Sequence, residues 1–375
     1  MIDYVVIKIK MAEETSTTSH MSDVIAPTPD DVTHTTGESV TSSWSRDTAV
    51  YFGCAVIIIG IVGTSANGFI LYALVASKQH KKHLLIFSQN VLDFASCIFL
   101  VITYALKISS INFTGLLGYY ICVLLHSEAL LWFAVSGSVG NLVIISIERY
   151  LKVVYPIWSK NKLRNWMIYS SIALCLLFSF VYNMITTFMT SDVVDGVCHL
   201  YIIWEDQVGK VVHGTLYFLW FYGLVLLICV VCYWRILVAI RRQARVMAGH
   251  NTGGTAQSTA AQAQAHHIQS NVIKTMILVC VFYAMAWLPM NTYYFLANVG
   301  GYLTFLDSGY YAVMFVAFLY VCMNPFIYAT KFEPVKKHIR RMLLCQTDDQ
   351  TSHTDTLQTT ATHTATRRTF QEHKF

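Results

Sequence analysis

Seven long runs of apolar residues follow one another along the chain, separated by shorter polar segments. They lie at residues 50–76, 84–106, 121–147, 166–190, 211–240, 272–297 and 309–330. A membrane-spanning helix needs about 20 apolar residues, because the hydrocarbon core is about 30 Å thick and a helix rises about 1.5 Å per residue. Lipid offers no partner to an unpaired backbone N–H, so such runs are expected to be continuous helices. The pattern predicts an all-α membrane protein, a bundle of seven transmembrane helices.

The composition favours a membrane protein over a soluble one. Of 375 residues, 55% are hydrophobic and 13% are charged, whereas soluble proteins carry about 25% charged residues. So few charges could not cover the surfaces of the roughly two or three soluble domains that this length suggests, and a disordered chain would be polar and rich in charge. The net charge of +5 does not indicate nucleic-acid binding, because the basic residues gather at the ends of the apolar runs.

The basic residues are distributed asymmetrically about the runs. One set of loops, together with the segment after the seventh run, carries 18 Lys and Arg residues, whereas the opposite loops carry only Lys107 and Lys210. Loops rich in Lys and Arg remain in the cytoplasm. We therefore expect a plasma-membrane protein with an extracellular N-terminus and a cytoplasmic C-terminus.

The segments outside the runs differ in kind. Residues 1–49 are rich in Thr, Ser and acidic residues, residues 249–271 form a low-complexity insert in a predicted cytoplasmic loop, and residues 346–375 are rich in Thr and Ser. We expect all three to be disordered around a transmembrane domain at residues 50–330. Residues 331–345 are basic and amphipathic, and we expect them to form an eighth helix lying on the membrane.

Several modification sites fit this orientation. Of the ten cysteines, only Cys122 and Cys198 lie at the predicted oxidising face, which predicts a disulfide between them. The sequon that begins at Asn112 lies in a predicted outer loop and is a candidate for glycosylation. On the inner side, Cys345 follows the basic stretch and is a candidate for palmitoylation.

Short motifs occupy defined places on the predicted spans. They are Asn67 in the first run, Asp93 in the second, Glu148-Arg149-Tyr150 at the inner end of the third, Trp287-Leu288-Pro289 in the sixth and Asn324-Pro325-Phe326-Ile327-Tyr328 in the seventh. In this order on seven spans, the motifs resemble those of the rhodopsin-like G-protein-coupled receptors. The resemblance covers about residues 50–345.

The resemblance implies a receptor that senses an extracellular ligand and activates a heterotrimeric G protein by outward motion of the sixth helix. Membrane lipid, and an arrestin and receptor kinases acting at the Ser/Thr-rich tail, are further implied partners. The implied activation switch consists of Glu148, Arg149, Tyr150, Tyr233, Trp287, Pro289, Asn324, Pro325 and Tyr328. A proline inside a helix removes a hydrogen bond and kinks the axis, so Pro289 and Pro325 mark hinges. Alternatively, Arg149 has no switching role and is a basic residue whose side chain extends to the lipid headgroups on the cytoplasmic side.

Asp93 is a carboxylate within a span, where a charge is costly unless it is paired or hydrated. By resemblance it would hold an allosteric sodium ion together with Ser138 and Asn324. The alternative is a polar network without an ion. Tyr320 stands where the family has another partner of the ion, which favours that alternative.

The predicted outer mouth limits the class of ligand. Leu131 stands where amine receptors of this family carry an Asp, and the seventh run has no Lys for a retinal Schiff base. The resemblance therefore implies neither a standard amine receptor nor a photoreceptor. We expect the ligand to contact Glu128, Leu131, Trp132, Glu205, Asp206, Trp287 and Asp307.

Glu128 is the leading candidate for a charged contact, because an ionisable residue within a span is usually functional. Together with the acidic outer loops it favours a basic or amidated peptide, since a negative potential attracts cations. Alternatively, the loop acids are solvated surface, and Glu128 pairs with His126 or with a loop.

Further positions depart from the family pattern. Cys122 lies two residues further from Arg149 than is usual, Val225 occupies the place of a proline in the fifth span, and Tyr283 replaces a usual Phe one turn before Trp287. These departures leave open the register at the top of the third span and the route by which a signal crosses the membrane.

A transporter or channel is the alternative class. Transport would require polar residues at the midplane of several spans or broken half-helices, whereas Asp93 is nearly alone at that depth. No metal-ligand or nucleophile constellation is recognisable in the sequence, so we expect no enzyme and, apart from the sodium ion, no cofactor.

Overall fold

The computed structural model describes residues 37–80, 83–109, 111–200, 206–249, 256–300 and 308–331. Ser45–Phe375 form one compact unit, and of the unit Met1–Trp44 only the helical residues from Gly37 are described. Cys345, the expected eighth helix beyond Lys331 and residues 1–36, 250–255 and 346–375 of the expected disordered segments lie outside the described residues, whereas residues 37–49 and 256–271 of those segments are helical.

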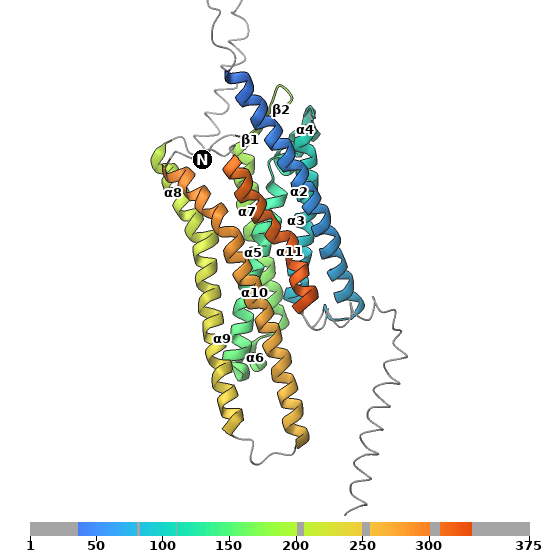
Figure 1. Cartoon of the computed structure of the whole chain (residues 1–375), viewed down its shortest axis with the longest axis vertical. Helices are drawn as coiled ribbons and strands as arrows, with labels where there is room; N and C mark the ends of the chain where they lie inside the picture. The colour runs from blue at the N-terminus through green and yellow to red at the C-terminus, as the bar shows by residue number, and fades with distance from the viewer. Residues whose placement is uncertain are drawn as a thin grey trace, which may run out of the picture. The chain divides into compact units, whose positions relative to one another are not determined.

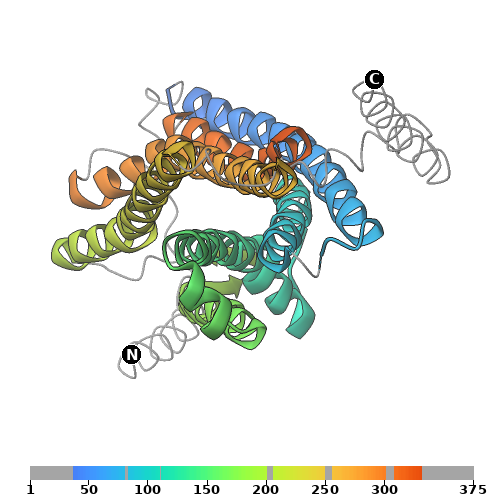
Figure 2. The same cartoon turned by 90° about the horizontal axis from the view of Figure 1, so that it is seen from below.

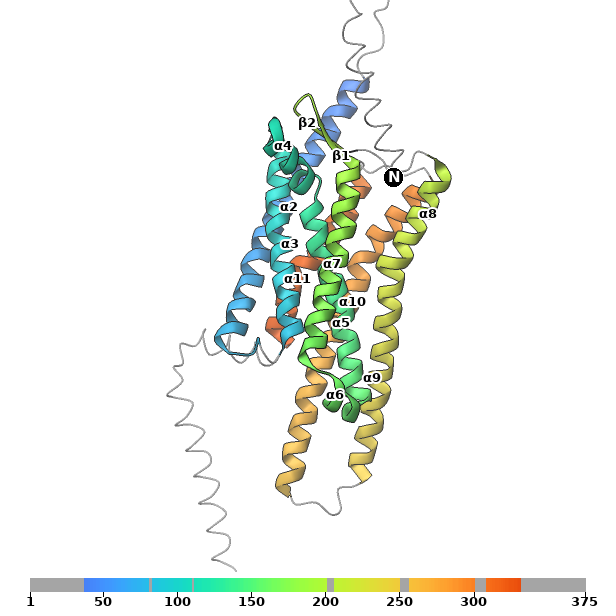
Figure 3. The same ribbon diagram turned by 180° about the vertical axis from the view of Figure 1, so that it is seen from behind.

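Seven stretches are long and apolar enough to cross a membrane, with lengths of 23 to 40 residues, which confirms the predicted bundle. Five of the spans are single helices: α2 (Gly37–Ala76), α3 (Leu84–Ile108), α7 (Asn165–Thr190), α10 (Ala256–Gly300) and α11 (Ser308–Lys331). The third span comprises α4 (Gly115–Ile121), η1 (Cys122–His126) and α5 (Ala129–Val154), and the short helix α6 (Pro156–Lys162) follows it. The fifth comprises α8 (Gln207–Tyr217), η2 (Phe218–Gly223) and α9 (Leu224–Gly249). Figures 1 and 3 show these elements from opposite sides.

Helix α5 is the element that most others touch. It contacts α3, α7, α9 and α10, while α10 pairs with α11, and α11 in turn contacts α3. Figure 2 views these helices from below, along their length. Large apolar side chains cover the outside of the spans, as on α7, where Trp166, Leu174 and Phe178 are exposed. Such an apolar outer surface suits contact with lipid tails.

Helix α2 approaches its neighbours closely at a glycine. A Cβ atom at Gly63 would lie 2.7 Å from Sγ of Cys97 on α3 and 2.8 Å from Sγ of Cys322 on α11. Close contact of membrane helices through small residues is a common source of packing energy, because apolar side chains gain little by leaving lipid.

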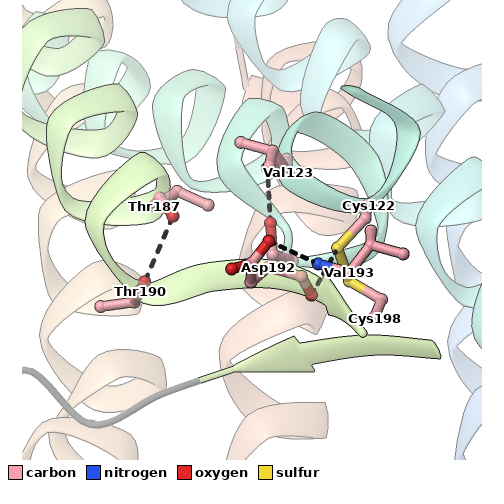
Figure 4. Close-up of a disulfide and its surroundings, with 8 residues drawn as sticks. Cys122, Val123, Thr187, Thr190, Asp192, Val193 and Cys198 are labelled. Atoms are coloured by element: carbon pink, nitrogen blue, oxygen red, sulfur yellow. Dashed lines mark hydrogen bonds between the residues drawn. A yellow bond between two sulfur atoms is a disulfide. The ribbon is translucent and has the colours of Figure 1, made fainter. Parts of the chain in front are cut away.

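A two-stranded hairpin covers one end of the third span. Strand β1 (Ser191–Val194) pairs antiparallel with β2 (Val197–Leu200). The turn residues Asp195 and Gly196 have φ angles of 51° and 76°, as a tight two-residue hairpin turn requires. Cys122 and Cys198 form the predicted disulfide, which ties η1 to β2 (Figure 4).

The third span is not a regular helix throughout. After the π-helical turn η1, Glu128 adopts a left-handed conformation with φ 68° and ψ 14°, and α5 begins at the next residue. A π-turn accommodates an additional residue. Both irregularities lie between Cys122 and Arg149, the stretch that is two residues longer than usual, and Cys122 still reaches Cys198.

The fifth span replaces a proline kink with a π-helix. Within η2, the carbonyl of Phe221 accepts a hydrogen bond from the hydroxyl of Tyr283 on α10 at 2.7 Å. In return, the hydroxyl of Tyr222 donates to the carbonyl of Ala284 at 2.8 Å. The hydroxyl that distinguishes Tyr283 from the usual Phe thus joins the fifth span to the sixth at the irregular turn.

Removing that hydroxyl should weaken the pairing of the two spans. We expect Tyr283→Phe to lower the stability of the purified protein by about 1–3 kcal/mol, because the carbonyl of Phe221 loses its buried donor. Thermal melting in detergent measures the change. Tyr169→Phe, at an exposed position on α7, is the control and should melt like the wild type. If Tyr283→Phe and Tyr169→Phe have the same melting temperature, the hydrogen bond from Tyr283 to Phe221 does not stabilise the protein.

Candidate functional site

A cavity of about 300 Å³ opens among the third, fourth, fifth, sixth and seventh spans. Most of its described lining residues are aromatic or carry hydroxyl or amide groups, the others are Val135, Val139, His213 and Met290, and none is Asp, Glu, Lys or Arg. The aromatic ones are Trp132, Tyr182, Tyr217, Phe221, Tyr283, Trp287, Tyr294 and Tyr310. A cavity of this chemistry suits an uncharged group that can stack on rings and exchange hydrogen bonds.

Two amide side chains add polar contacts to the cavity wall. Asn183 on α7 donates to the hydroxyl of Ser136 on α5 at 3.0 Å, which fixes one wall. Asn291 on α10 donates to the carbonyl of Trp287 at 2.8 Å, across the turn that contains Pro289. Both carbonyl oxygens of these amides therefore have a fixed direction relative to the cavity.

A series of neighbouring aromatic rings, in tilted and edge-on contact, leads from the cavity into the interior. Of the predicted ligand residues, Trp132 and Trp287 both line it, with ring centroids 6.2 Å apart. The ring of Trp287 in turn lies 6.3 Å from those of Tyr283 and Tyr320. Since the whole column is packed and Pro289 interrupts the same helix, a ligand that moves Trp287 would also move the rings beneath it.

Glu128 lies behind this cavity rather than on its surface. Its carboxylate contacts Lys107 Nζ at 2.5 Å, accepts from the hydroxyl of Tyr104 at 3.1 Å and accepts from the indole N–H of Trp132 at 2.8 Å. The residue is buried, with 9% of its surface exposed. Its cationic partner is thus a lysine of the second span, neither His126 nor a loop residue. Lys107 already neutralises the charge that was expected to meet a ligand.

Leu131 and Asp206, two further predicted ligand residues, are not part of the described lining. Leu131 is 1% exposed and packs in the core. Asp206 caps α8, where its carboxylate accepts from the backbone N–H of Gly209 at 2.7 Å. Glu205 and Asp307 lie outside the described residues.

At the opposite end of the third span, the charged motif is paired locally. Glu148 contacts Arg149 Nε at 3.0 Å and also pairs with Lys152, one turn on. The hydroxyl of Tyr233 on α9 lies 3.4 Å from that of Ser146 on α5, and Tyr328 on α11 is fully buried. Arg149 therefore pairs with the preceding residue of its own helix.

The residues that were predicted to surround a sodium ion lie together around Asp93. Ser138 donates to Oδ1 at 2.6 Å and Asn324 donates to Oδ2 at 2.9 Å, so the structure brings the three predicted residues together. Gln89 and Asn141 also belong to this buried network, and sequence analysis missed both. The available signal was helical spacing, since Gln89 precedes Asp93 by four residues and Asn141 follows Ser138 by three.

Comparison with known proteins identifies the family of the chain. The family model described as "7 transmembrane receptor (rhodopsin family)" matches residues 66–328, well over half of the chain. The chain belongs to this receptor family. Its fold is also similar to the crystal structure of squid rhodopsin, with a TM-score of 0.65 and 18% identity over 90% of this chain and 95% of that one.

Relatives of this receptor include several that are named for peptides. The chain is 24% identical to human neuropeptide Y receptor type 4-2 over 85% of its length and 86% of that protein. It is 22% identical to galanin receptor type 1 of Rattus norvegicus, over 82% of its length and 85% of that protein. The match to tachykinin-like peptides receptor 86C of Drosophila melanogaster, at 23% identity, spans 56% of this chain and only 42% of that protein.

The left-handed conformation of Glu128 is open to a direct test. We expect Glu128→Gly and Glu128→Ala both to melt below the wild-type receptor in detergent, because both leave Lys107 without its carboxylate. The glycine variant should be the more stable of the two by about 1 kcal/mol, since only alanine is strained at positive φ.

A regular helical position provides the matched control. At Ser136, in the interior of α5, the order should reverse, because glycine destabilises a helix by about 1 kcal/mol relative to alanine. If alanine is favoured at both positions, residue 128 is not left-handed in the folded receptor.

Proposed function

We propose that this receptor binds an extracellular peptide and then activates a heterotrimeric G protein through outward motion of the sixth helix. One observation carries the proposal: the cavity is lined by Trp287, two residues before the proline that interrupts α10. A ligand that contacts this ring acts on the helix whose movement would uncover Arg149. The names of the neuropeptide Y, galanin and tachykinin-like relatives support a peptide as the ligand.

The cavity suggests which part of the peptide enters it. A volume of about 300 Å³ is at the lower end of ligand pockets, and it suits a terminal residue or two rather than a whole peptide. The absence of charge among its described lining residues favours an aromatic, uncharged end, such as an amidated C-terminus. Basic residues further along the peptide would meet the outer acids, with Glu205, Asp206 and Asp307 as candidates.

Glu128 would then act on the ligand indirectly. Its carboxylate holds the indole N–H of Trp132, and the ring of Trp132 lines the cavity. The Lys107–Glu128 pair would thereby fix the orientation of a ligand-contacting ring. This role replaces the direct charge contact that the sequence suggested.

Binding must shift an equilibrium between two arrangements of the spans, because a ligand at the cavity cannot reach the cytoplasm. In the arrangement described here, Glu148 holds Arg149. In the active one, Arg149 would be released toward the G protein, with Tyr233 and Tyr328 meeting near it. The ligand can shift this equilibrium only by the ratio of its affinities for the two arrangements, so it must bind the active one more tightly.

We infer a plasma-membrane location with the hairpin end outside. The Cys122–Cys198 disulfide supports this, because disulfides persist on the oxidising side of the membrane. Asn112, which is exposed beside the hairpin turn, would be glycosylated on the same side. An arrestin and receptor kinases would bind the cytoplasmic segment that follows α11, and Cys345 in that segment would be palmitoylated. Membrane lipid would surround the spans.

A G-protein dissociation assay in cells expressing the receptor tests the proposal with a panel of peptides. We expect at least one peptide to cause dissociation, and we expect Arg149→Ala to abolish the response while surface binding of that peptide remains. An ion-flux and uptake measurement on the same cells tests the transporter or channel alternative. Peptide-dependent flux without G-protein dissociation would replace the receptor interpretation.

The uncharged cavity makes a further prediction about the active peptide. Its amidated form should bind at least about tenfold more tightly than the free acid of the same sequence, because a carboxylate buried without a cationic partner carries a desolvation penalty of several kcal/mol. Competition binding measures the ratio. A peptide amidated only at an internal side chain is the control and should show no such gain. Equal affinities of amide and acid would show that the C-terminus does not enter the cavity.

A further inference from the structure

Gln89 is a fully buried amide on α3, one turn before Asp93. Its Nε2 lies 2.5 Å from the hydroxyl oxygen of Ser138, and 3.4 Å and 3.5 Å from Oδ1 and Oδ2 of Asp93. Its Oε1 accepts from Asn141 Nδ2 at 2.9 Å. Together with the bonds from Ser138 and Asn324, the Asp93 carboxylate is therefore surrounded by neutral hydrogen-bond donors from three helices.

The direction in which the Gln89 amide points follows from its neighbours. Asn141 Nδ2 also donates to the backbone carbonyl of Leu85 at 3.0 Å. A carbonyl only accepts, so the amide nitrogen of Asn141 must face it. The same nitrogen faces Gln89, which must then present its oxygen to Asn141. The N–H groups of Gln89 are left to point at Ser138 and Asp93.

This arrangement does not suit the sodium ion that the resemblance implies at Asp93. A hard cation is held by oxygen lone pairs, but the hydroxyl oxygen of Ser138 accepts from Gln89 and gives its own proton to Asp93. The N–H hydrogens of Gln89 carry positive partial charge and point toward the same oxygens. A sodium ion would have to displace the amide and break its bonds to Ser138 and Asn141.

We propose that the Gln89 amide takes the place of the ion, so that this receptor carries a built-in neutral partner for Asp93 and does not respond to sodium. The amide is part of the chain and cannot dissociate. Asp93 therefore stays tied to α5 and α11 whatever the sodium concentration outside the cell, and Gln89 is a positioning residue for this network.

Thermal melting of the purified wild-type receptor tests the proposal without a ligand or a G protein. We expect the same melting temperature in sodium chloride and in choline chloride of equal ionic strength, because an ion that binds the folded state would raise it. A higher melting temperature in sodium that disappears in Asp93→Asn would overturn the proposal. This readout is independent of the proposed function, so the two can fail separately.

The variant Gln89→Leu tests whether the amide itself excludes the ion. It removes the donors with little change in volume, and we expect sodium to raise its melting temperature. If the proposed signalling holds, sodium should also shift its peptide response by at least about fivefold, the lower end of usual allosteric coupling.

The double variant Gln89→Leu/Asp93→Asn is the matched control and should lose this gained sodium effect. If Gln89→Leu folds and stays insensitive to sodium, the amide is not what excludes the ion, and the proposal is wrong. Should Gln89→Leu fail to fold, Gln89→Met provides the same comparison.

Discussion

Inside a bilayer, a polar side chain can find a hydrogen-bond partner only elsewhere in the protein, and this constraint organises the structure around α5. Along this helix, Ser136 accepts from Asn183 on α7, Ser138 and Asn141 bond Asp93 and Gln89 on α3, and Ser146 lies near Tyr233 on α9. Each such bond contributes little over an alternative partner, about 0.6 kcal/mol on average in one membrane protein. Their number and direction nevertheless fix which faces of the helices meet.

The same constraint explains how the irregular turns are tolerated. Where η2 departs from a regular helix, the hydroxyl of Tyr283 supplies a donor to the backbone of Phe221. Where the third span breaks at Glu128, the left-handed residue is held by Lys107, Tyr104 and Trp132. Both turns flank the cavity through Phe221 and Trp132. The departures from the family pattern thus shape the wall of the cavity.

Charge is handled in three different ways along the membrane normal. Near the hairpin end, Glu128 is paired with Lys107, which is itself partly exposed. Near the opposite end, Glu148 shares Arg149 and Lys152. Between them, the described hydrogen-bond donors to Asp93 are all neutral. The two ends thus pair opposite charges, whereas the middle surrounds one carboxylate with hydrogen-bond donors.

The sequence by itself determined the spans, the Cys122–Cys198 disulfide and the family, because apolar run length, the placement of charged residues and motif order are local properties that do not depend on how helices face one another. It also contained the Asp195-Gly196 turn signal of the hairpin, which sequence analysis overlooked. Only the tertiary structure decided that Glu128 faces Lys107 and that Gln89 faces Ser138 and Asn141 on α5. Those pairings join two helices, so they depend on the rotation of each helix about its axis, which the π-turn η1 alters in the third span and which no single run of residues specifies.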